Sequence, residues 1–146
     1  MYKIIPATYV FTHVYLNTMQ QGIQSLHATV ELFIQNRVDP DLLDKVYEWA
    51  ESYKTVRILS AGGGEFFDES LLESKRLAEK YGLPWASFNE PDIRDMITAV
   101  AMVVTPEMVF EVENAQEALE MMHDNNLDYA EGHELAQFLS EFHTAR

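Results

Sequence analysis

The segment QQGIQSLHA, residues 20–28, opens a helix directly after a strand-like run, and its two-sided pattern organises the rest of the chain. At about 100° per residue, one arc of this helix is apolar and predicts the face that packs on the core: Ile23, Leu26, Val30, Phe33 and Ile34. A polar ridge borders that arc, formed by Gln20, Gln24, His27 and Glu31. This ridge is either a row of satisfied polar residues or one wall of a functional site.

The composition indicates one globular domain. The chain has 146 residues, of which 47% are hydrophobic and 12% aromatic, enough to build a core. Its net charge of −14 disfavours broad electrostatic binding of nucleic acid, although a local patch could use some of the ten Lys and Arg residues. The absence of cysteine excludes disulfides and thiolate chemistry.

The hydropathy pattern points away from a membrane. No apolar run has the length of a membrane span, and residues 1–6 lack the apolar core of a signal peptide. We therefore expect a cytoplasmic protein with no membrane partner.

The order of predicted elements defines the fold class. Residues rich in β-branched and aromatic types predict strands over 8–16, 55–60, 84–88 and 96–104. Helices are expected at about 19–36, from Asp39-Pro40 to about 53, and from an Asp68 cap to Tyr81. This order predicts an α/β three-layer sandwich with a four-stranded mixed sheet and a helical C-terminal extension. The first crossover would be parallel, and the last two strands antiparallel.

The acidic C-terminal third forms the extension. We expect a main domain over residues 1–112 and an extension over 113–146, with helices at about 115–122 and 128–142. The extension has narrow apolar stripes: Leu119 and Met122, then Leu135, Phe138, Leu139 and Phe142. These stripes could pack on the core, on each other or on a partner.

Three consecutive glycines, Gly62 to Gly64, follow the predicted strand 55–60. No Gly-Lys-Ser/Thr follows them, and the acidic and aromatic residues that do follow suit a phosphate poorly. A flexible connector is the better interpretation, and a small-nucleotide-binding function would depend on this loop alone.

A second group of polar residues lies between the last two strands. Glu90 and Asp92 leave one strand around Pro91, and Asp95 and Thr98 enter the next. Hydrolysis of an acyl ester needs a base to activate water and hydrogen-bond donors for the oxyanion, and a carboxylate here with donors from the polar ridge would provide both. The alternative is an ordinary polar turn. The five histidines show no metal-binding spacing, so no metal is predicted.

Three segments together resemble the type 2 peptidyl-tRNA hydrolase family, in particular its compact bacterial and phage relatives. Residues 22–28 resemble the Gln-x-x-His-Ala helix of that family, and residues 81–84 resemble its Leu-Pro turn. The stretch Phe88-x-Glu90-Pro91-Asp92, followed by Thr98-Ala99, resembles its Phe-x-Glu-Pro-Asp and Thr-Ala motifs. The resemblance covers roughly residues 8–110.

The resemblance implies a homodimer that hydrolyses the ester between peptide and tRNA without metal or cofactor. It implies Glu90 or Asp92 as base or water-orienting group, with His27 beside them. Binding of substrate, including tRNA through a local patch, would involve Gln20, Gln24, Asp95 and Thr98. Where the family has a lysine, however, this chain has Gln20, which supplies no positive charge. Two hypotheses therefore stand: an active hydrolase, and a relative that keeps the fold as a binding or interaction module.

Overall fold

The structure is a computed structural model that describes residues 3–121 and 132–144. Along the main part of the chain the elements are β1 (Ala7–Thr12), α1 (Thr18–Gln35), α2 (Pro40–Glu48), the π-helical turn η1 (Trp49–Tyr53), β2 (Val56–Ser60), α3 (Gly64–Tyr81), β3 (Trp85–Glu90), the 3-10 turn η2 (Pro91–Ile93) and β4 (Met96–Val104). They are followed by α4 (Pro106–Met121), α5 (His133–Ser140) and the two-residue β5 (His143–Thr144).

The strands form one mixed sheet in the order β3-β4-β1-β2-β5. β1 and β2 are parallel, whereas β1 with β4 and β3 with β4 are antiparallel. The four main strands confirm the predicted mixed sheet and both predicted strand orientations. The short β5, which pairs antiparallel with β2, was not predicted from the sequence.

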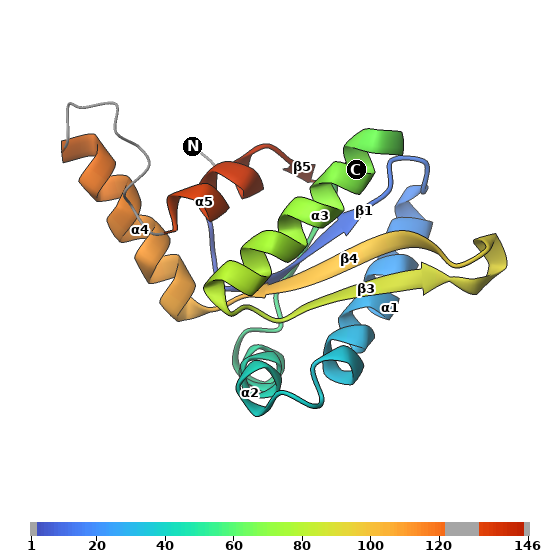
Figure 1. Cartoon of the computed structure of the whole chain (residues 1–146), viewed down its shortest axis with the longest axis horizontal. Coiled ribbons are helices and arrows are strands. Elements are labelled where there is room, and N and C mark those ends of the chain that lie inside the picture. Colours follow the sequence, from blue (N-terminus) through green and yellow to red (C-terminus); the bar gives the residue numbers. More distant parts are fainter. Residues whose placement is uncertain (1–2, 122–131, 145–146) are drawn as a thin grey trace.

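Helices cover both faces of the sheet, so the predicted three-layer sandwich is confirmed (Figure 1). β1 is buried along its whole length, as expected for a central strand. On one face, Val10 and Ala101 pack with α1 and α2 through Ala28, Leu32 and Val46. On the other face, Phe11 and Met102 pack with α3, α4 and α5. No helix within residues 3–121 and 132–144 is long and apolar enough to cross a membrane.

The prediction for the buried face of α1 is wrong. Four of the five apolar residues expected in the core are exposed, namely Ile23, Leu26, Val30 and Ile34, and Phe33 is only partly buried. Apart from Leu32, the residues that the helix buries instead are small or polar: Gln21, Ser25, Ala28 and Thr29. Small side chains let the helix approach the sheet closely. The buried hydroxyls cost little because Ser25 donates to the carbonyl of Gln21, and Thr29 to that of Ser25.

Two predicted element boundaries also differ. β1 ends at Thr12, because residues 13–16 turn away from the sheet, with the Leu16 amide donating to the carbonyl of His13. The start of α3 is Gly64 and not the predicted Asp68 cap. The glycine segment is therefore a tight turn into a helix. Gly62 and Gly64 have positive φ, and a side chain at Gly63 would crowd the loop after β1.

The C-terminal extension packs on the main domain. α4 is a single helix from Pro106 to Met121, so it begins well before residue 115, where the sequence predicted the first helix of the extension. In α5 and just after it, the predicted apolar stripe is buried in the core that also contains Phe11: Leu135, Phe138, Leu139 and Phe142. Of the other predicted stripe, Met122 lies outside the described residues. The division at residue 112 stays a prediction.

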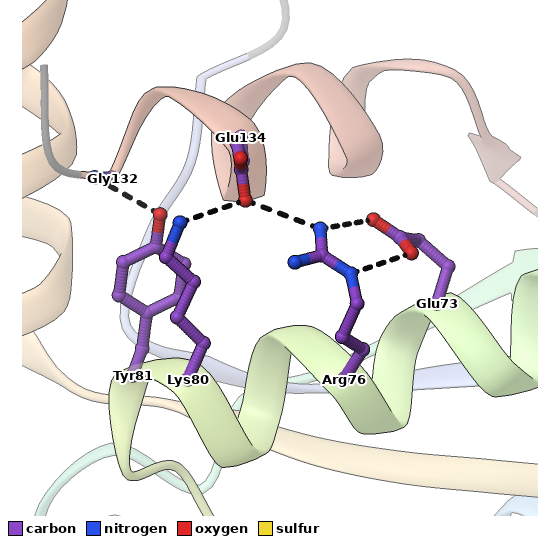
Figure 2. A network of polar contacts seen from close by, with 6 residues as sticks. All are labelled: Glu73, Arg76, Lys80, Tyr81, Gly132 and Glu134. Carbon is purple, nitrogen blue, oxygen red and sulfur yellow. Dashed lines mark hydrogen bonds and ion pairs between the residues drawn. The ribbon is translucent and has the colours of Figure 1, made fainter. Parts of the chain in front are cut away.

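Polar contacts also join α5 to α3 (Figure 2). Glu134 accepts hydrogen bonds from Lys80 Nζ at 3.0 Å and Arg76 Nη2 at 3.1 Å, and the Tyr81 hydroxyl accepts from the Gly132 amide at 3.3 Å. The hydrogen bonds from Lys80 and Arg76 lower the pKa of the Glu134 carboxyl. The hydrogen bond between Lys80 and Glu134 also raises the pKa of Lys80. These ion pairs are exposed, so they orient α5 more than they stabilise it.

Candidate functional site

A chain of hydrogen bonds joins three of the sequence-predicted residues from three elements. The side-chain amide of Gln24 on α1 donates to Glu90 Oε2 at the end of β3, over 2.8 Å. The hydroxyl of Thr98 on β4 donates to Gln24 Oε1, over 3.0 Å. Gln24 and Glu90 are half-buried, and Thr98 is buried. We call Gln24, Glu90 and Thr98 the polar triad.

The fold explains why the triad forms. β3 and β4 are antiparallel neighbours, so the end of β3 lies beside the start of β4. α1 crosses these strands with its polar ridge toward them, because its small residues face the sheet. The ridge therefore borders the sheet, although the apolar arc next to it points to solvent and not to the core.

Glu90 has a second contact that orders its carboxylate. Its other oxygen, Oε1, accepts from the amide of Asp92 at 3.3 Å and so caps the η2 turn. A carboxylate offers about four lone-pair positions, so Glu90 keeps acceptor capacity for a water molecule. A half-buried, oriented carboxylate of this kind can act as a general base.

The turn after Glu90 is tight. Arg94 and Asp95 both have positive φ, a conformation that non-glycine residues seldom adopt. The Asp95 amide donates to the carbonyl of Glu90 over 3.0 Å, and its carbonyl accepts from Asn89 Nδ2 over 3.1 Å. Such strain persists only where surrounding contacts hold it, and it is concentrated at functional sites.

The structure does not bring the other predicted residues into the hydrogen-bonded chain. Asp92 is exposed, and among the described residues its carboxylate has no hydrogen-bond partner. Asp95 acts through its backbone. The His27 ring is exposed and stacks on Phe88, with ring centroids 4.5 Å apart and planes 13° apart. His27 therefore lies beside the triad, one helical turn beyond Gln24.

Gln20 is committed to the start of α1. Its side-chain Oε1 accepts from the backbone amide of Asn17 at 3.1 Å, and its backbone amide donates to the side-chain Oδ1 of Asn17 at 2.8 Å. This reciprocal pair is a capping box, which the Asn-x-x-Gln spacing could have revealed from the sequence. Gln20 is exposed, and its carbonyl oxygen is occupied by the cap.

Sequence reasoning overlooked Arg94. It is exposed on the turn that follows Glu90, and it is the only Lys or Arg between residues 81 and 145. That isolation in an acidic chain was a readable signal. Arg94 is thus the cation nearest in sequence to the triad and a candidate contact for an anionic ligand.

Other features of the molecule lie away from the triad. A cleft of about 530 Å³ lies near Trp85, at the opposite end of β3 from Glu90, and Asp39, Lys75 and Glu79 are among its lining residues. Within the described residues, no group of three His, Asp or Glu side chains could hold a metal ion.

Burial lowers the pKa of His13, partly offset by nearby Asp68. The His13 ring contacts Tyr15 and Phe67, and its Nδ1 accepts from the Tyr15 amide. These contacts hold the His13 ring in place between its aromatic neighbours.

The fold and the triad define an α/β protein with a polar site beside the turn that joins β3 to β4. A scan of known protein families finds no match to the chain, and a search of curated proteins finds none either.

Proposed function

We propose that the protein is an esterase-type hydrolase of peptidyl-tRNA that needs no metal. The observation that carries the proposal is the polar triad, because it joins a carboxylate, an amide and a hydroxyl from three segments distant in sequence. Those segments include two of the motifs that resemble type 2 peptidyl-tRNA hydrolases.

In the proposed reaction, Glu90 holds the attacking water and accepts its proton as the water oxygen bonds to the ester carbonyl carbon. The side-chain amide of Gln24 has two N–H donors and uses one on Glu90, and in this scheme the other donates to the oxyanion. The bond between the carbonyl carbon and the ribose oxygen then breaks. The ribose oxygen takes the proton from Glu90, which leaves a tRNA hydroxyl and a peptide carboxylic acid, and the acid then loses its proton to bulk water.

Thr98 acts as a positioning residue in this scheme. Its hydroxyl donates to the side-chain oxygen of Gln24, and this bond orients the side-chain amide nitrogen of Gln24 toward Glu90. Arg94 would contact a backbone phosphate near the ester. With so few cations at the site, we expect tRNA affinity to fall only gently with salt.

The direct test is release of peptide from a peptidyl-tRNA analogue by the purified protein. Glu90→Gln keeps the size of the side chain but removes the base, and we expect a loss of about 10²- to 10⁴-fold in kcat. Glu48→Gln, which changes an exposed carboxylate on α2, is the matched control and should leave the rate unchanged. Asp92→Ala tests the other predicted base, and a larger loss there would move the role to Asp92. Absence of release above background by the wild type would overturn the proposal.

A second candidate is a binding or interaction module without chemistry. The capping role of Gln20 favours it, because the residue at the family's lysine position serves the helix and carries no charge. A gel shift with labelled tRNA, read beside the hydrolysis assay, separates the two candidates. If Gln20→Lys creates hydrolysis that the wild type lacks, the protein is a relative that has lost the activity.

A further inference from the structure

Two exposed aromatic rings flank the glycine turn between β2 and α3. Tyr15, in the loop after β1, is 84% exposed, and Phe66, near the start of α3, is 57% exposed. A Cβ added at Gly62 would lie 2.6 Å from the ring of Phe66. One added at Gly63 would lie 3.3 Å from the ring of Tyr15. Because Gly62 and Gly63 are consecutive, both rings border the same turn.

The Tyr15 ring is held in place although it is exposed. One of its faces stacks on the His13 ring, with centroids 4.8 Å apart and planes 28° apart. The Phe67 ring packs against His13 in turn, with centroids 4.8 Å apart. The backbone amide of Tyr15 also donates to His13 Nδ1 over 3.2 Å. The other face of the Tyr15 ring is therefore ordered and open to a ligand, which reduces the entropy lost on binding.

The charges near this turn are acidic. Glu65, Asp68 and Glu69 are exposed near the start of α3. Asp68 partly offsets the lowered pKa of His13, so its carboxylate lies near that ring. Within residues 3–121 and 132–144, no ion pair includes any of these three acids. Residues 4–36 and 58–74, which contain the loop after β1 and the turn, have no Lys or Arg.

An open aromatic face beside carboxylates favours an organic cation as ligand. A guanidinium or substituted ammonium group is attracted both by the face of the ring and by the negative charge. In the part of the chain that the structure describes, three Lys or Arg side chains lie within 5.9 Å of aromatic ring centroids, but none of them lies over Tyr15 or Phe66. The acids disfavour a phosphate or an anionic lipid surface at the same place.

We propose that the glycine turn binds an organic cation, a guanidinium or substituted ammonium group, which stacks on the open face of Tyr15 with Asp68 as its counter-charge. Phe66 borders this site across the turn. The proposal does not depend on the proposed hydrolase activity, because no residue of the polar triad takes part. A single ring with exposed carboxylates binds weakly, so we expect a dissociation constant in about the millimolar range that rises with salt.

Nuclear magnetic resonance titration of the isotope-labelled full chain tests this site. N-acetyl-arginine amide should shift the backbone signals of Tyr15 and Gly63, and N-acetyl-citrulline amide, which has a similar shape without the charge, should not. Tetramethylammonium chloride, compared with sodium chloride, is the second arm. Binding of the arginine compound supports recognition of an arginine side chain, and binding of tetramethylammonium supports recognition of a quaternary ammonium ligand. Absence of shifts with both cations up to about 20 mM overturns the proposal, and so do equal shifts with the citrulline compound.

Two variants test the assigned contacts. Tyr15→Leu keeps an apolar side chain but removes the ring, so we expect cation binding to weaken by about fivefold. Asp68→Asn should weaken it by about twofold and reduce its salt dependence. Tyr47→Leu and Asp44→Asn, at exposed positions on α2, are the matched controls and should leave binding unchanged. The spectra also show whether each variant keeps the fold. A folded Tyr15→Leu variant that binds the cation as tightly as the wild type would overturn the proposal.

Discussion

Gln20 shows how a residue predicted to bind substrate can instead have a structural role, through its capping box with Asn17. The capping box satisfies two backbone amides at the start of α1, in a turn that has no acidic residue to complement the helix dipole. The position of Gln20 is then explained by helix initiation alone. Any role in binding would be additional.

We predict that Asn17→Ala lowers the free energy of unfolding by about 1 kcal/mol, because the backbone amide of Gln20 loses its acceptor, the side-chain oxygen of Asn17. Gln20→Lys removes only the reciprocal bond to the Asn17 amide and should cost less. Urea denaturation followed by circular dichroism measures both. A larger loss for Gln20→Lys than for Asn17→Ala would show that Gln20 has a second structural partner.

His13 predicts a pH dependence of stability. Burial lowers its pKa in the folded state below the ordinary value of 6.5, so the unfolded chain binds a proton more readily. The contribution of neutral His13 is full above pH 6.5 and is lost as pH falls through the folded-state pKa. We expect His13→Asn, which keeps an acceptor for the Tyr15 amide, to flatten the fall of the melting temperature between about pH 7 and 5. An unchanged slope would contradict this account.

At the scale of elements, α1 shows where sequence reasoning succeeds and fails. The 3.6-residue period predicted the helix and its polar ridge correctly. It could not tell which side faces the sheet, because close packing on a sheet favours small residues such as Ala28 and Ser25 over large apolar ones. The apolar arc that the sequence predicts for the core therefore lies on the exposed side of the helix. The strands were more predictable because a short apolar run rich in β-branched residues, such as β4, is typical of a sheet interior.

β3 is an edge strand that α1 protects. The side-chain amide nitrogen of Gln35 donates to the backbone carbonyl of Ser87 at 2.8 Å, and the side-chain oxygen of Gln35 accepts from the backbone amide of Ser87 at 3.2 Å. Gln35 thus takes the place of a neighbouring strand. The adjacent Asn36 side chain donates to the carbonyl of Trp85 in the same way. Covered edges resist pairing with other chains.

We predict that Gln35→Ala lowers the free energy of unfolding by about 1 kcal/mol, since three exposed hydrogen bonds are lost, two with the backbone of Ser87 and one with Glu31. It should also raise the rate of aggregation at elevated temperature, because the backbone of Ser87 becomes available to other strands. Light scattering during a thermal ramp measures this rate. Gln20→Ala, an exposed glutamine on the same helix away from β3, is the control. Equal aggregation of both variants would show that the edge is not the cause.

At the scale of the molecule, the triad depends on topology that the sequence only partly reveals. The sequence predicted that helix and turn residues converge, because antiparallel β3 and β4 bring Glu90 and Thr98 together. It could not separate Glu90 from Asp92, since both are acidic residues of one turn. Only the geometry distinguishes the half-buried carboxylate bonded to Gln24 from the exposed one.

The C-terminal helix α5 is part of the core, so we expect it to unfold together with the sheet. Phe138 is buried, with its ring centroid 5.5 Å from that of Phe11 and 4.9 Å from that of Phe142. Phe11 is on the central strand. Loss of the Phe138 ring should therefore be felt throughout the sheet and not only in α5.

We predict that Phe138→Ala lowers the free energy of unfolding by about 3–5 kcal/mol. The two tryptophans, Trp49 and Trp85, lie outside the extension, so their fluorescence reports on the main domain. If α5 belongs to one cooperative unit, the urea midpoint from tryptophan fluorescence falls together with that from circular dichroism. Phe110→Ala, which removes an exposed ring on α4, should change neither midpoint appreciably. A fluorescence midpoint that stays at the wild-type value in Phe138→Ala would mean that the main domain is stable without α5.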